Sequence, residues 1–397
     1  MFMIKALTGN YAVAWAVRLS RVKVVAAYPI TPQTTMVEKL AEFIDKGEMD
    51  AKMIRVDSEF SALAATWGAA ASGVRSFTAT SSHGLLYMHE MLWWVAGSRI
   101  PLVMAVATRT IGPPWNIWTD HSDIMDQRDT GWIIMMAEHN QEVLDTIIQL
   151  YRVTEDPRVF LPGIVGLDAF ILTHTTEPVD VPEQYVVDSY LPERRQPYVM
   201  SIKEPITMGN IPSSLKDNMK MRWDIHTSML RAKEVIEEAD REWSKLTGRS
   251  YGGLIECYRC EDAKAYIVGM GAWVGDMREA VDMLRDEGYD FGLIKIRFIR
   301  PFPDDRIAKI LGNSKLCLVF DRSVSAGSAG PLYLDLAANM YRLGIRTHII
   351  NVLAGLTGLD VRSDEIAYVS RKLYEMIERG EEVKGIVWYF GGDELWL

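Results

Sequence analysis

Short runs of β-branched apolar residues alternate with amphipathic helical stretches along most of this chain. In the first part, apolar runs that end near Pro, Ser or Thr are separated by stretches whose apolar residues recur every three or four positions. Strands are predicted there at 23–28, 53–56, 75–80, 101–107 and 159–165, and helices at 11–19, 34–43, 59–71, 85–96 and 141–153. Strands that alternate with helices pair in parallel through right-handed crossovers. The pattern therefore predicts an α/β fold built on an open parallel sheet.

The same alternation returns near residue 262 and predicts a second α/β unit. Its strands are predicted at 265–268, 292–296, 316–320 and 348–352, and its helices at 274–287, 304–311, 332–343 and 365–377. Before it, residues 175–212 predict an extended surface connection, and 229–246 a long charged helix. A chain of 397 residues suits two or three domains. We expect domains at 1–174 and 262–397, joined by residues 175–261.

The charge balance and the cysteine count restrict the partners of the chain. It carries 43 Lys and Arg against 53 Asp and Glu, a formal charge of −10, which argues against nucleic acid or an anionic membrane as the main partner. Its three cysteines are too few for a disulfide framework or for a four-thiolate iron–sulfur cluster. The first residues lack the build of a signal peptide, and the longest apolar stretch is interrupted by Arg99 and Pro101. We expect a cytoplasmic protein.

Polar side chains follow three of the predicted strands. Thr31 comes after the first strand, Ser81 and Ser82 after another, and Arg109 after a third. Because ligands of open α/β sheets bind beyond the carboxyl ends of the strands, these residues are expected to face one crevice. Arg109 can hold a carboxylate in a bidentate manner while Thr31 adds a hydroxyl donor. The alternative is that Arg109 pairs with a structural acid and Thr31 caps a helix.

Glu59 lies at the start of a predicted helix, and two interpretations remain open for it. An acidic residue in the first turn complements the helix dipole, which is the commoner role. The other interpretation is a carboxylate placed at a cofactor nitrogen.

Two further groups of residues have a chemical and a structural interpretation. Asp120, His121 and Asp123 lie in a long loop, 111–130, where a hydrogen-bond network is favoured over a metal site because no second His or Cys stands at ligand spacing. Cys257 and Cys260 form a C-x-x-C, which we interpret as an incidental pair because only one other cysteine is present.

Glycine-rich segments at 269–275 and 325–330 are weak candidates for phosphate loops. Neither has the dinucleotide-binding spacing, and a tight strand-to-helix turn explains both equally well. The chain has no P-loop, so nucleoside triphosphate hydrolysis is not expected. A stand-alone NAD(P)-dependent dehydrogenase is a poor alternative because the glycine-rich segments do not match the dinucleotide-binding spacing.

Taken together, the ordered motifs resemble those of a known family. The chain is similar to the alpha subunits of multi-subunit 2-oxoacid:ferredoxin oxidoreductases, most closely to the pyruvate synthase branch. The segments that carry the resemblance are 27–32, 56–59, 77–85, 88–90, 116–118, 120–123, 127–132, 163–174 and 300–303.

The resemblance implies a fold, a set of cofactors and a set of partners. It implies a thiamine-diphosphate-binding open sheet of the pyrimidine type, followed by a domain like the C-terminal domain of transketolase. A beta subunit would hold the Mg²⁺ and diphosphate half of the cofactor, and [4Fe-4S] clusters would lie in partner chains and not in this one. Gamma and ferredoxin-like delta subunits, coenzyme A as co-substrate and ferredoxin as acceptor complete the expectation, in a dimer of hetero-oligomers.

The resemblance also assigns roles to single residues. Glu59 would hydrogen-bond N1′ of the aminopyrimidine, and Thr31 and Arg109 would hold the substrate carboxylate. Cofactor contacts are expected from Glu59, Tyr28, Pro29, Ser82 and Gly84, and substrate contacts from Thr31, Arg109, Asn116 and Ile117.

One segment departs from the pattern of the pyruvate enzymes. Residues 110–115 replace a stretch of small residues, His83 stands where Gln is common, and two tryptophans follow at 93 and 94. Pyruvate is the expected substrate, with a branched-chain or aryl 2-oxo acid such as phenylglyoxylate as the alternative. Oxalate would require a second cationic residue. A non-catalytic scaffold for iron–sulfur subunits is the alternative from another class.

Overall fold

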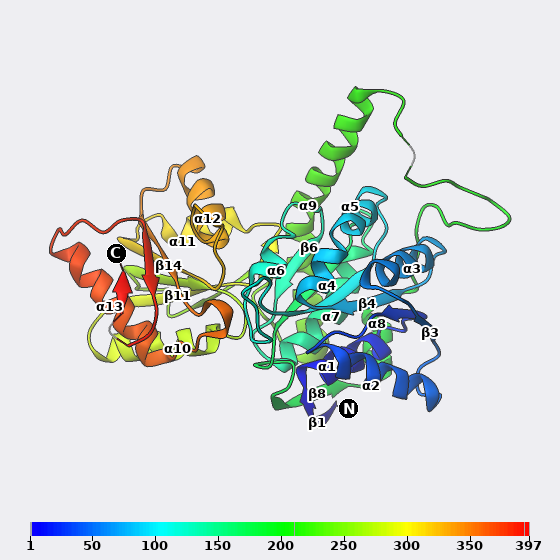
Figure 1. The fold of residues 1–397 in the computed structure, drawn as a ribbon, viewed down its shortest axis with the longest axis horizontal. Helices are drawn as coiled ribbons and strands as arrows, with labels where there is room; N and C mark the ends of the chain where they lie inside the picture. Colours follow the sequence, from blue (N-terminus) through cyan, green and yellow to red (C-terminus); the bar gives the residue numbers. More distant parts are fainter. Residues whose placement is uncertain (1, 210, 393, 397) are drawn as a thin grey trace.

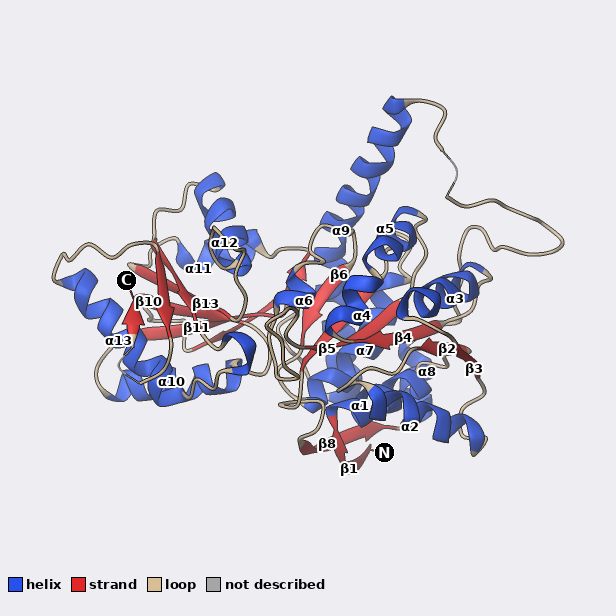
Figure 2. Cartoon of the chain, in the orientation of Figure 1, coloured by secondary structure: helices blue, strands red, loops and turns tan. Residues whose placement is uncertain are grey.

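Two seven-stranded sheets lie in the two halves of the molecule (Figure 1). The computed structural model describes residues 2–209, 211–392 and 394–396. Residues 24–168 supply all strands of the first sheet except one edge strand, which comes from residues 298–300, and the second sheet is built from strands between residues 255 and 396 (Figure 2). This arrangement confirms the predicted α/β fold.

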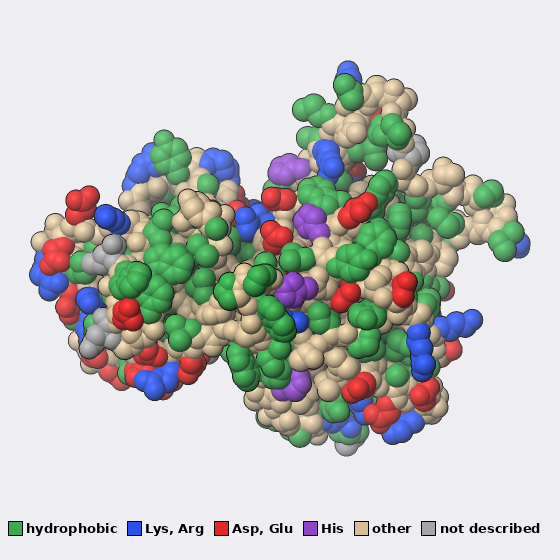
Figure 3. All heavy atoms as spheres, in the orientation of Figure 1, with side chains coloured by type: hydrophobic (Ala, Val, Ile, Leu, Met, Phe, Trp, Pro, Cys, Tyr) green, Lys and Arg blue, Asp and Glu red, His purple; other side chains and the backbone are tan. Residues whose placement is uncertain are grey.

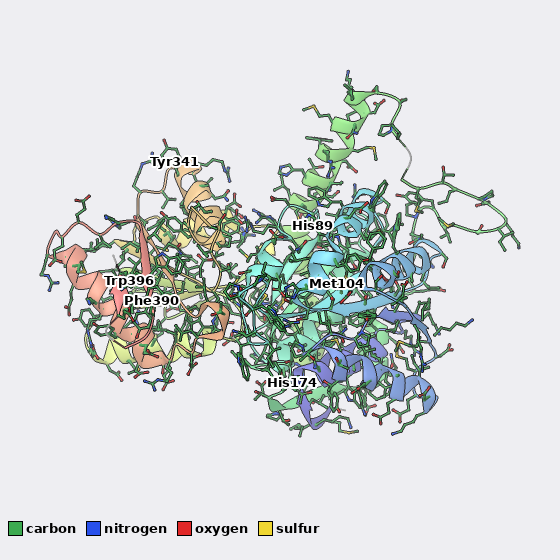
Figure 4. The ribbon with its side chains drawn as sticks, viewed as in Figure 1. His89, Met104, His174, Tyr341, Phe390 and Trp396 are labelled. Atoms are coloured by element: carbon green, nitrogen blue, oxygen red, sulfur yellow. A yellow bond between two sulfur atoms is a disulfide. The ribbon has the colours of Figure 1, made fainter. Side chains whose placement is uncertain are left out.

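The first sheet has the order β12-β6-β7-β5-β4-β2-β3, and all of its neighbours are parallel except the edge pair β12–β6. Its strands are β2 (Val24–Ala27), β3 (Lys52–Arg55), β4 (Ser76–Thr80), β5 (Val103–Thr108), β6 (Ile133–Met136), β7 (Gly163–Asp168) and β12 (Phe298–Arg300). Its helices are α1 (Gly9–Leu19), α2 (Thr34–Asp45), α3 (Glu59–Ala71), α4 (Ser82–Tyr87), α5 (His89–Gly97), α6 (Ser122–Met125) and α7 (Asn140–Thr154). Met104, the second residue of the central strand β5, is fully buried and belongs to a core cluster with Leu92 and Trp132 (Figure 4).

The second sheet has the order β16-β15-β14-β13-β10-β11-β9. Its strands are β9 (Ile255–Tyr258), β10 (Ala265–Gly269), β11 (Phe291–Ile296), β13 (Leu316–Asp321), β14 (His348–Leu353), β15 (Ile386–Tyr389) and β16 (Leu395–Trp396). Its helices are α10 (Val274–Asp286), α11 (Asp304–Leu311), α12 (Pro331–Arg342) and α13 (Ser363–Glu378), with a short 3-10 turn η1 (Leu356–Gly358).

The predicted surface connection over 175–212 is largely wrong. Its first part is β8 (Thr176–Pro182), which pairs antiparallel with β1 (Phe2–Thr8) at the start of the chain. Helix α8 (Gln184–Tyr190) follows, and only the residues after it form an extended loop. Sequence patterns miss this small sheet because its two strands are far apart in the chain and pair only in the folded state.

Other elements begin or end elsewhere than predicted. The helix expected over 85–96 is divided into α4 and α5 at Met88, and β6 was not predicted. Helix α9 (Leu215–Thr247) starts well before the predicted residue 229, because Ser214 caps it by accepting a hydrogen bond from the Asp217 amide (3.1 Å). Its first turns bury little apolar surface, so apolar periodicity gives no sign of them.

The two cysteines of the C-x-x-C segment form a covalent bond. Cys257 of β9 and Cys260 are joined in a disulfide, and Cys317 is a free thiol buried in β13. The expectation of an incidental pair is corrected accordingly, since the turn between the two residues brings their sulfur atoms together.

The two sheets are connected by a buried ion-pair network and a shared core. Glu142 of α7 accepts hydrogen bonds from Lys295 (2.9 Å) and from Arg297 (2.6 Å), and all three side chains are almost fully buried. Burial opposes ionisation, but the two cations hold the pKa of Glu142 at about 2. Apolar residues of both halves, such as Trp132 and Leu332, belong to one core cluster. The functional loops are therefore carried by a rigid frame.

Among the helices that the structure describes, none combines the length and the apolar composition needed to cross a bilayer.

Candidate functional site

The carboxyl edge of the first sheet brings the predicted site residues together. Strand β2 has β3 on one side and β4 on the other, so the strand order reverses direction between β2 and β4. Ligands of open α/β sheets bind at such a switch point. Thr31 follows β2, Gly84 follows β4, Arg109 follows β5, and Glu59 opens the helix that follows β3.

Glu59 is the first residue of α3, which begins there because Ser58 accepts a hydrogen bond from the Ser61 amide (3.2 Å). The side chain is only 8 % exposed. Among the described residues, no hydrogen-bond donor and no cation contacts its carboxylate. A buried carboxylate without a partner is costly, since burial without a hydrogen bond destabilises a charged group. Its position therefore points to a ligand that supplies a donor.

Because residue 84 is a glycine, there is room beside it for the side chain of Glu59. A Cβ atom at residue 84 would lie 2.7 Å from Oε1 of Glu59, closer than real contacts allow, and it would also meet the Thr80 hydroxyl. The Thr80 hydroxyl is buried and has no hydrogen-bond partner in the described part of the chain. Glu59 and Thr80 thus place two unsatisfied polar groups around one glycine.

Arg109 is buried, and main-chain carbonyl groups hold its guanidinium. Nε donates to the Thr31 carbonyl (2.8 Å) and Nη1 donates to the Asn116 carbonyl (3.3 Å). The ring of Trp115 lies over the guanidinium at 5.7 Å from its centre. Among the residues described, no carboxylate lies within ion-pair distance of this side chain, although the charge of the nearby Asp123 opposes the lowering of the Arg109 pKa by burial. The interpretation of Arg109 as the partner of a structural acid is therefore not supported, and its charge is available to an anion.

The side chain of Gln33 holds the loop after β2 in place through hydrogen bonds. Its side-chain amide donates to the carbonyl groups of Tyr28 (2.9 Å) and Ala79 (3.0 Å), which ties this loop to β4. The side chains of Tyr28, Pro29 and Thr31 are exposed. Tyr28 and Pro29 also border a groove of about 880 Å³ between α2 and the edge strand β3. The first two residues thus lie at the rim of the site, and Thr31 contacts Arg109 through its main chain.

Ser82 begins α4, and its side chain faces the protein. Its hydroxyl donates to the Thr110 carbonyl, and the residue is fully buried with a φ angle of 49°. Ser82 therefore shapes the turn after β4, and its hydroxyl group already has a partner.

Asp123 joins the turn after β4 to the end of β5. Its carboxylate accepts hydrogen bonds from the amides of Ser82 (2.9 Å), Arg109 (3.1 Å) and Ile124 (2.8 Å). Burial raises the pKa of Asp123 to about 8, although the amide groups of Arg109 and Ser82 oppose that shift. The predicted hydrogen-bond network around Asp123 is confirmed. The sequence does not predict its contact with the main chain of Arg109.

The side chain of Asn116 forms hydrogen bonds both within the loop after β5 and with the second half of the chain. Its Oδ1 accepts from the Thr110 hydroxyl (3.0 Å), and its amide donates to the Thr357 carbonyl (2.7 Å). Ile117 beside it is partly buried. Asn116 therefore contacts Arg109 through its carbonyl group and links the site to the second half of the chain.

In the first glycine-rich segment, 269–275, the main chain binds a carboxylate of this chain and not a phosphate. Asp168 accepts a hydrogen bond from the Ala272 amide (2.7 Å), and a Cβ atom at Gly271 would collide with it. His121 also bonds Asp168 (2.8 Å), and with Arg322 it keeps the pKa of Asp168 below its ordinary value despite burial. The tight-turn interpretation holds for this segment.

The second glycine-rich segment has the same explanation. Asp321 at the end of β13 accepts hydrogen bonds from the amides of Leu332 (3.0 Å) and Tyr333 (3.1 Å) at the start of α12. A carboxylate of the protein thus occupies this helix N-terminus as well, which disfavours a dinucleotide there. Within residues 2–209, 211–392 and 394–396, no group of His, Cys, Asp or Glu side chains is arranged to hold a metal ion.

Comparison with known proteins gives consistent similarities along the chain. Residues 16–241 match the sequence model of the thiamine-diphosphate-binding domain of pyruvate flavodoxin/ferredoxin oxidoreductase, and residues 263–366 match core domain II of pyruvate:ferredoxin oxidoreductase. The chain is 43 % identical to the pyruvate synthase subunit PorA of Pyrococcus horikoshii over 96 % of both chains. It is 42 % identical to the ketoisovalerate oxidoreductase subunit VorA of the same organism over 97 % of both.

Solved structures show the same fold. The 2-oxoglutarate:ferredoxin oxidoreductase of Magnetococcus marinus superposes with a TM-score of 0.72 at 18 % identity, over 93 % of this chain and 65 % of that one. The chain thus spans slightly less than two thirds of that structure. A split-gene transketolase superposes with a TM-score of 0.55 at 10 % identity, over 93 % of this chain and 98 % of the other.

Proposed function

Since the chain belongs to the pyruvate:ferredoxin oxidoreductase family as an alpha subunit, we propose that its first sheet binds the aminopyrimidine of thiamine diphosphate and the carboxylate of a 2-oxo acid. The observation that carries the proposal is a pair of charged side chains at one sheet edge, Glu59 and Arg109, neither of which forms an ion-pair contact among the described residues. We further propose that residues 1–174 and 262–397 are the two domains and that residues 175–261 connect them.

The residues at the switch point fit the aminopyrimidine. A buried carboxylate can accept a hydrogen bond from a protonated ring nitrogen, and Glu59 is such a carboxylate with no competing partner. Gly84 keeps the space beside it open, and the unpaired Thr80 hydroxyl adds a polar group. When bound, thiamine diphosphate supplies the nucleophilic carbon that attacks the 2-oxo group and accepts the electrons of the broken C–C bond. Glu59 would hold the ring in place and stabilise its protonated form.

Arg109 would orient the substrate by its carboxylate. Nε and Nη1 are held by carbonyl groups, so the guanidinium keeps one orientation without a substrate. A planar cation with donors still available suits bidentate carboxylate binding. Burial lowers the pKa of Arg109, but not enough to remove its charge at neutral pH.

The remaining parts of the reaction would come from other chains. We propose a beta subunit for the diphosphate and Mg²⁺, gamma and delta subunits with it for the [4Fe-4S] clusters, coenzyme A as acyl acceptor and ferredoxin as electron acceptor. We place the complex in the cytoplasm. Support comes from the three cysteines of this chain, two joined in a disulfide and one buried, which leave it without thiolates for a cluster.

Pyruvate is the proposed substrate, with 3-methyl-2-oxobutanoate as the second candidate because the ketoisovalerate subunit is as similar as the pyruvate synthase subunit. The test is viologen reduction by the purified complex with coenzyme A and a panel of 2-oxo acids that includes phenylglyoxylate and oxalate. We expect kcat/KM to be highest for pyruvate. A higher value for the branched acid would reverse the order of the two candidates. No reduction with any 2-oxo acid by a complex that contains thiamine diphosphate would support the scaffold.

A second prediction concerns Asp123, which fixes the main chain of Arg109. In Asp123→Ala, the main-chain amides of Arg109 and Ser82, which both donate to Oδ2 of Asp123, lose their acceptor. We expect KM for the 2-oxo acid to rise by about tenfold to a hundredfold, since a displacement of about 1 Å can have such an effect. KM for coenzyme A should stay unchanged.

Asp240→Ala is the matched control for this variant. Asp240 is also buried and accepts hydrogen bonds from the main-chain amides of Tyr251 (3.2 Å) and Gly253 (3.2 Å), but it lies on α9. Its loss should lower the melting temperature without changing KM. Equal kinetic effects in the two variants would show that Asp123 has only a structural role.

A further inference from the structure

Loops from the two halves of the molecule meet between the two sheets (Figure 1). One is the loop after β5, residues 109–121, and the other contains the short turn η1 (Leu356–Gly358). The Asn116 side-chain amide donates to the Thr357 carbonyl (2.7 Å), and the Thr357 amide donates to the Asp120 carboxylate (2.8 Å). The main chain of one residue in the second half therefore holds the loop at two positions.

Gly358 brings the turn directly against Trp118. Its φ angle is 81°, and a Cβ atom at this position would collide with the Cβ atom of Trp118. Both the backbone conformation and the close approach therefore require glycine here. Trp118 in turn is bonded within the loop, because its amide donates to Oδ1 of Asn116 (2.9 Å) and its carbonyl accepts from the Thr110 amide (3.3 Å). The turn thus supports the loop at a third position.

Thr357 has a backbone conformation that its residue type disfavours. Its φ and ψ angles are 55° and 23°, in the left-handed region that a β-branched residue rarely adopts. Such a conformation persists where the surrounding structure determines it. Both main-chain groups of Thr357 are bonded to the loop, while the residue is exposed. The contact with the loop therefore holds the turn in one conformation.

The loop carries one of the two carbonyl groups that orient Arg109. Nη1 of Arg109 donates to the Asn116 carbonyl (3.3 Å), and Nε donates to the Thr31 carbonyl (2.8 Å). Thr31 lies in the loop after β2 of the first sheet, whereas Asn116 is bonded to the second half through Thr357. The orientation of the guanidinium therefore depends on both halves of the chain.

Within the first half of the chain, side chains support this loop on either side of its middle. The Gly112 amide donates to the His83 ring (3.3 Å), and the Thr119 hydroxyl donates to Asp168 (2.5 Å). Between them, Trp115 is 58 % exposed, and hydrophobic side chains lie on the surface where the two halves meet (Figure 3). Exposed segments with few buried contacts open at a low free-energy cost. The contacts of η1 are therefore important for the order of this loop.

We propose that the η1 turn positions the substrate-binding arginine: Thr357 and Gly358 hold the middle of the loop, and the Asn116 carbonyl transmits this support to Arg109. The second half of the chain thereby takes part in substrate binding. Thr357 and Gly358 are positioning residues, since they act on the guanidinium through Asn116. The inference rests on the proposed role of Arg109 in binding the carboxylate of the 2-oxo acid.

The test compares Gly358→Ala with Gly344→Ala in the purified complex. Gly344 also has a positive φ angle, 77°, but a Cβ atom there would meet no described atom within 4 Å. Both substitutions therefore strain the backbone, and only Gly358→Ala displaces the turn from Trp118. In Gly358→Ala we expect KM for the 2-oxo acid to rise about tenfold to a hundredfold, since a displacement of about 1 Å has such an effect.

Gly344→Ala should leave KM for the 2-oxo acid unchanged, and KM for coenzyme A should stay unchanged in both variants. The melting temperature should fall in both, because both glycines adopt a conformation that alanine disfavours. Equal KM values for the 2-oxo acid in the two variants would overturn the proposal.

Asp120→Ala removes a contact of the turn without adding an atom to it. Asp120 is buried and accepts from the Thr357 amide, and Asp240→Ala, which removes another buried acceptor of main-chain amides, is its control. We expect KM for the 2-oxo acid to rise in Asp120→Ala and to stay unchanged in Asp240→Ala. An unchanged KM in Asp120→Ala would contradict the role of Thr357.

Hydrogen–deuterium exchange of the same complexes tests the contact separately from the activity. The amide of Trp118 should exchange about tenfold faster in Gly358→Ala than in the wild type, because local opening becomes easier, and at the wild-type rate in Gly344→Ala. Unchanged exchange in Gly358→Ala would show that η1 does not order the loop. Faster exchange with a wild-type KM would show that the loop does not position Arg109. Failure of the proposed function has a different result, an unchanged KM in Arg109→Leu.

Discussion

Replacing Glu59 by glutamine should reduce the turnover of the assembled complex by about a hundredfold to ten-thousandfold, the usual contribution of a group that controls a catalytic proton. Alanine at this position should abolish turnover. The side chain is buried beside Gly84 and has no partner among the described residues, so its removal breaks no contact of the fold. The melting temperature should therefore stay close to that of the wild type. Viologen reduction and the dissociation constant of thiamine diphosphate are the two measurements.

Two matched variants separate this role from a general effect on helices. Glu90 is also a first-turn acid, at the start of α5, and Glu90→Gln should leave turnover unchanged. Gly84→Ala should reproduce the loss seen for Glu59, because its Cβ would displace the carboxylate, whereas Gly68→Ala, in open space on α3, should not. If Glu59→Gln turned over substrate at the wild-type rate, Glu59 would have no role in catalysis.

Replacing Arg109 by leucine should raise KM for the 2-oxo acid and leave KM for coenzyme A unchanged. Loss of one partner of a buried charge pair costs about 2–5 kcal/mol, which corresponds to a decrease in kcat/KM of about 30-fold to several thousandfold. Arg109→Lys should keep only part of the wild-type kcat/KM, since an ammonium group cannot replace the two donors of the planar guanidinium. Steady-state kinetics with both substrates varied in turn is the measurement.

Arg75→Leu is the control for Arg109. Arg75 is another buried arginine of this sheet, but it lies at the amino end of β4 and pairs with Glu155 (2.8 Å). Its loss should lower stability without changing KM for the 2-oxo acid. If Arg109→Leu changed both KM values equally, Arg109 would act on the fold of the loop and not on the substrate carboxylate.

The parts of the fold that local patterns encode were predicted well. Helix α3 begins at Glu59 as predicted, because Ser58 caps it, and α11 has the predicted bounds. Nine of the strands in the two sheets were predicted, because each is a short apolar run between helices, whereas β6, β9, β12, β15 and β16 were not. The pairing of β1 with β8 and of β12 with β6 was not predicted, since these contacts join residues far apart in the chain.

The candidate site residues were chosen from motifs, and the structure shows where they lie and which contacts they make. Glu59 and Gly84 stand in recognisable motifs, yet only the structure places one against the other. Asp123 lay in a segment that was interpreted as a hydrogen-bond network, and no local signal indicated that it binds the amide of Arg109. Local sequence cannot report such contacts, because they depend on how several loops meet at one sheet edge.

By itself, the sequence determined the α/β class, the family and the residues at the ends of the strands, because periodicity and motifs are local properties of the chain. The tertiary structure alone decided that the carboxylate of Glu59 and the guanidinium of Arg109 lie at the same sheet edge, each without an ion-pair contact among the described residues. It also decided that the glycine-rich turns are occupied by Asp168 and Asp321. Whether a buried charge is satisfied depends on every group that surrounds it in space, and that environment exists only after the chain has folded.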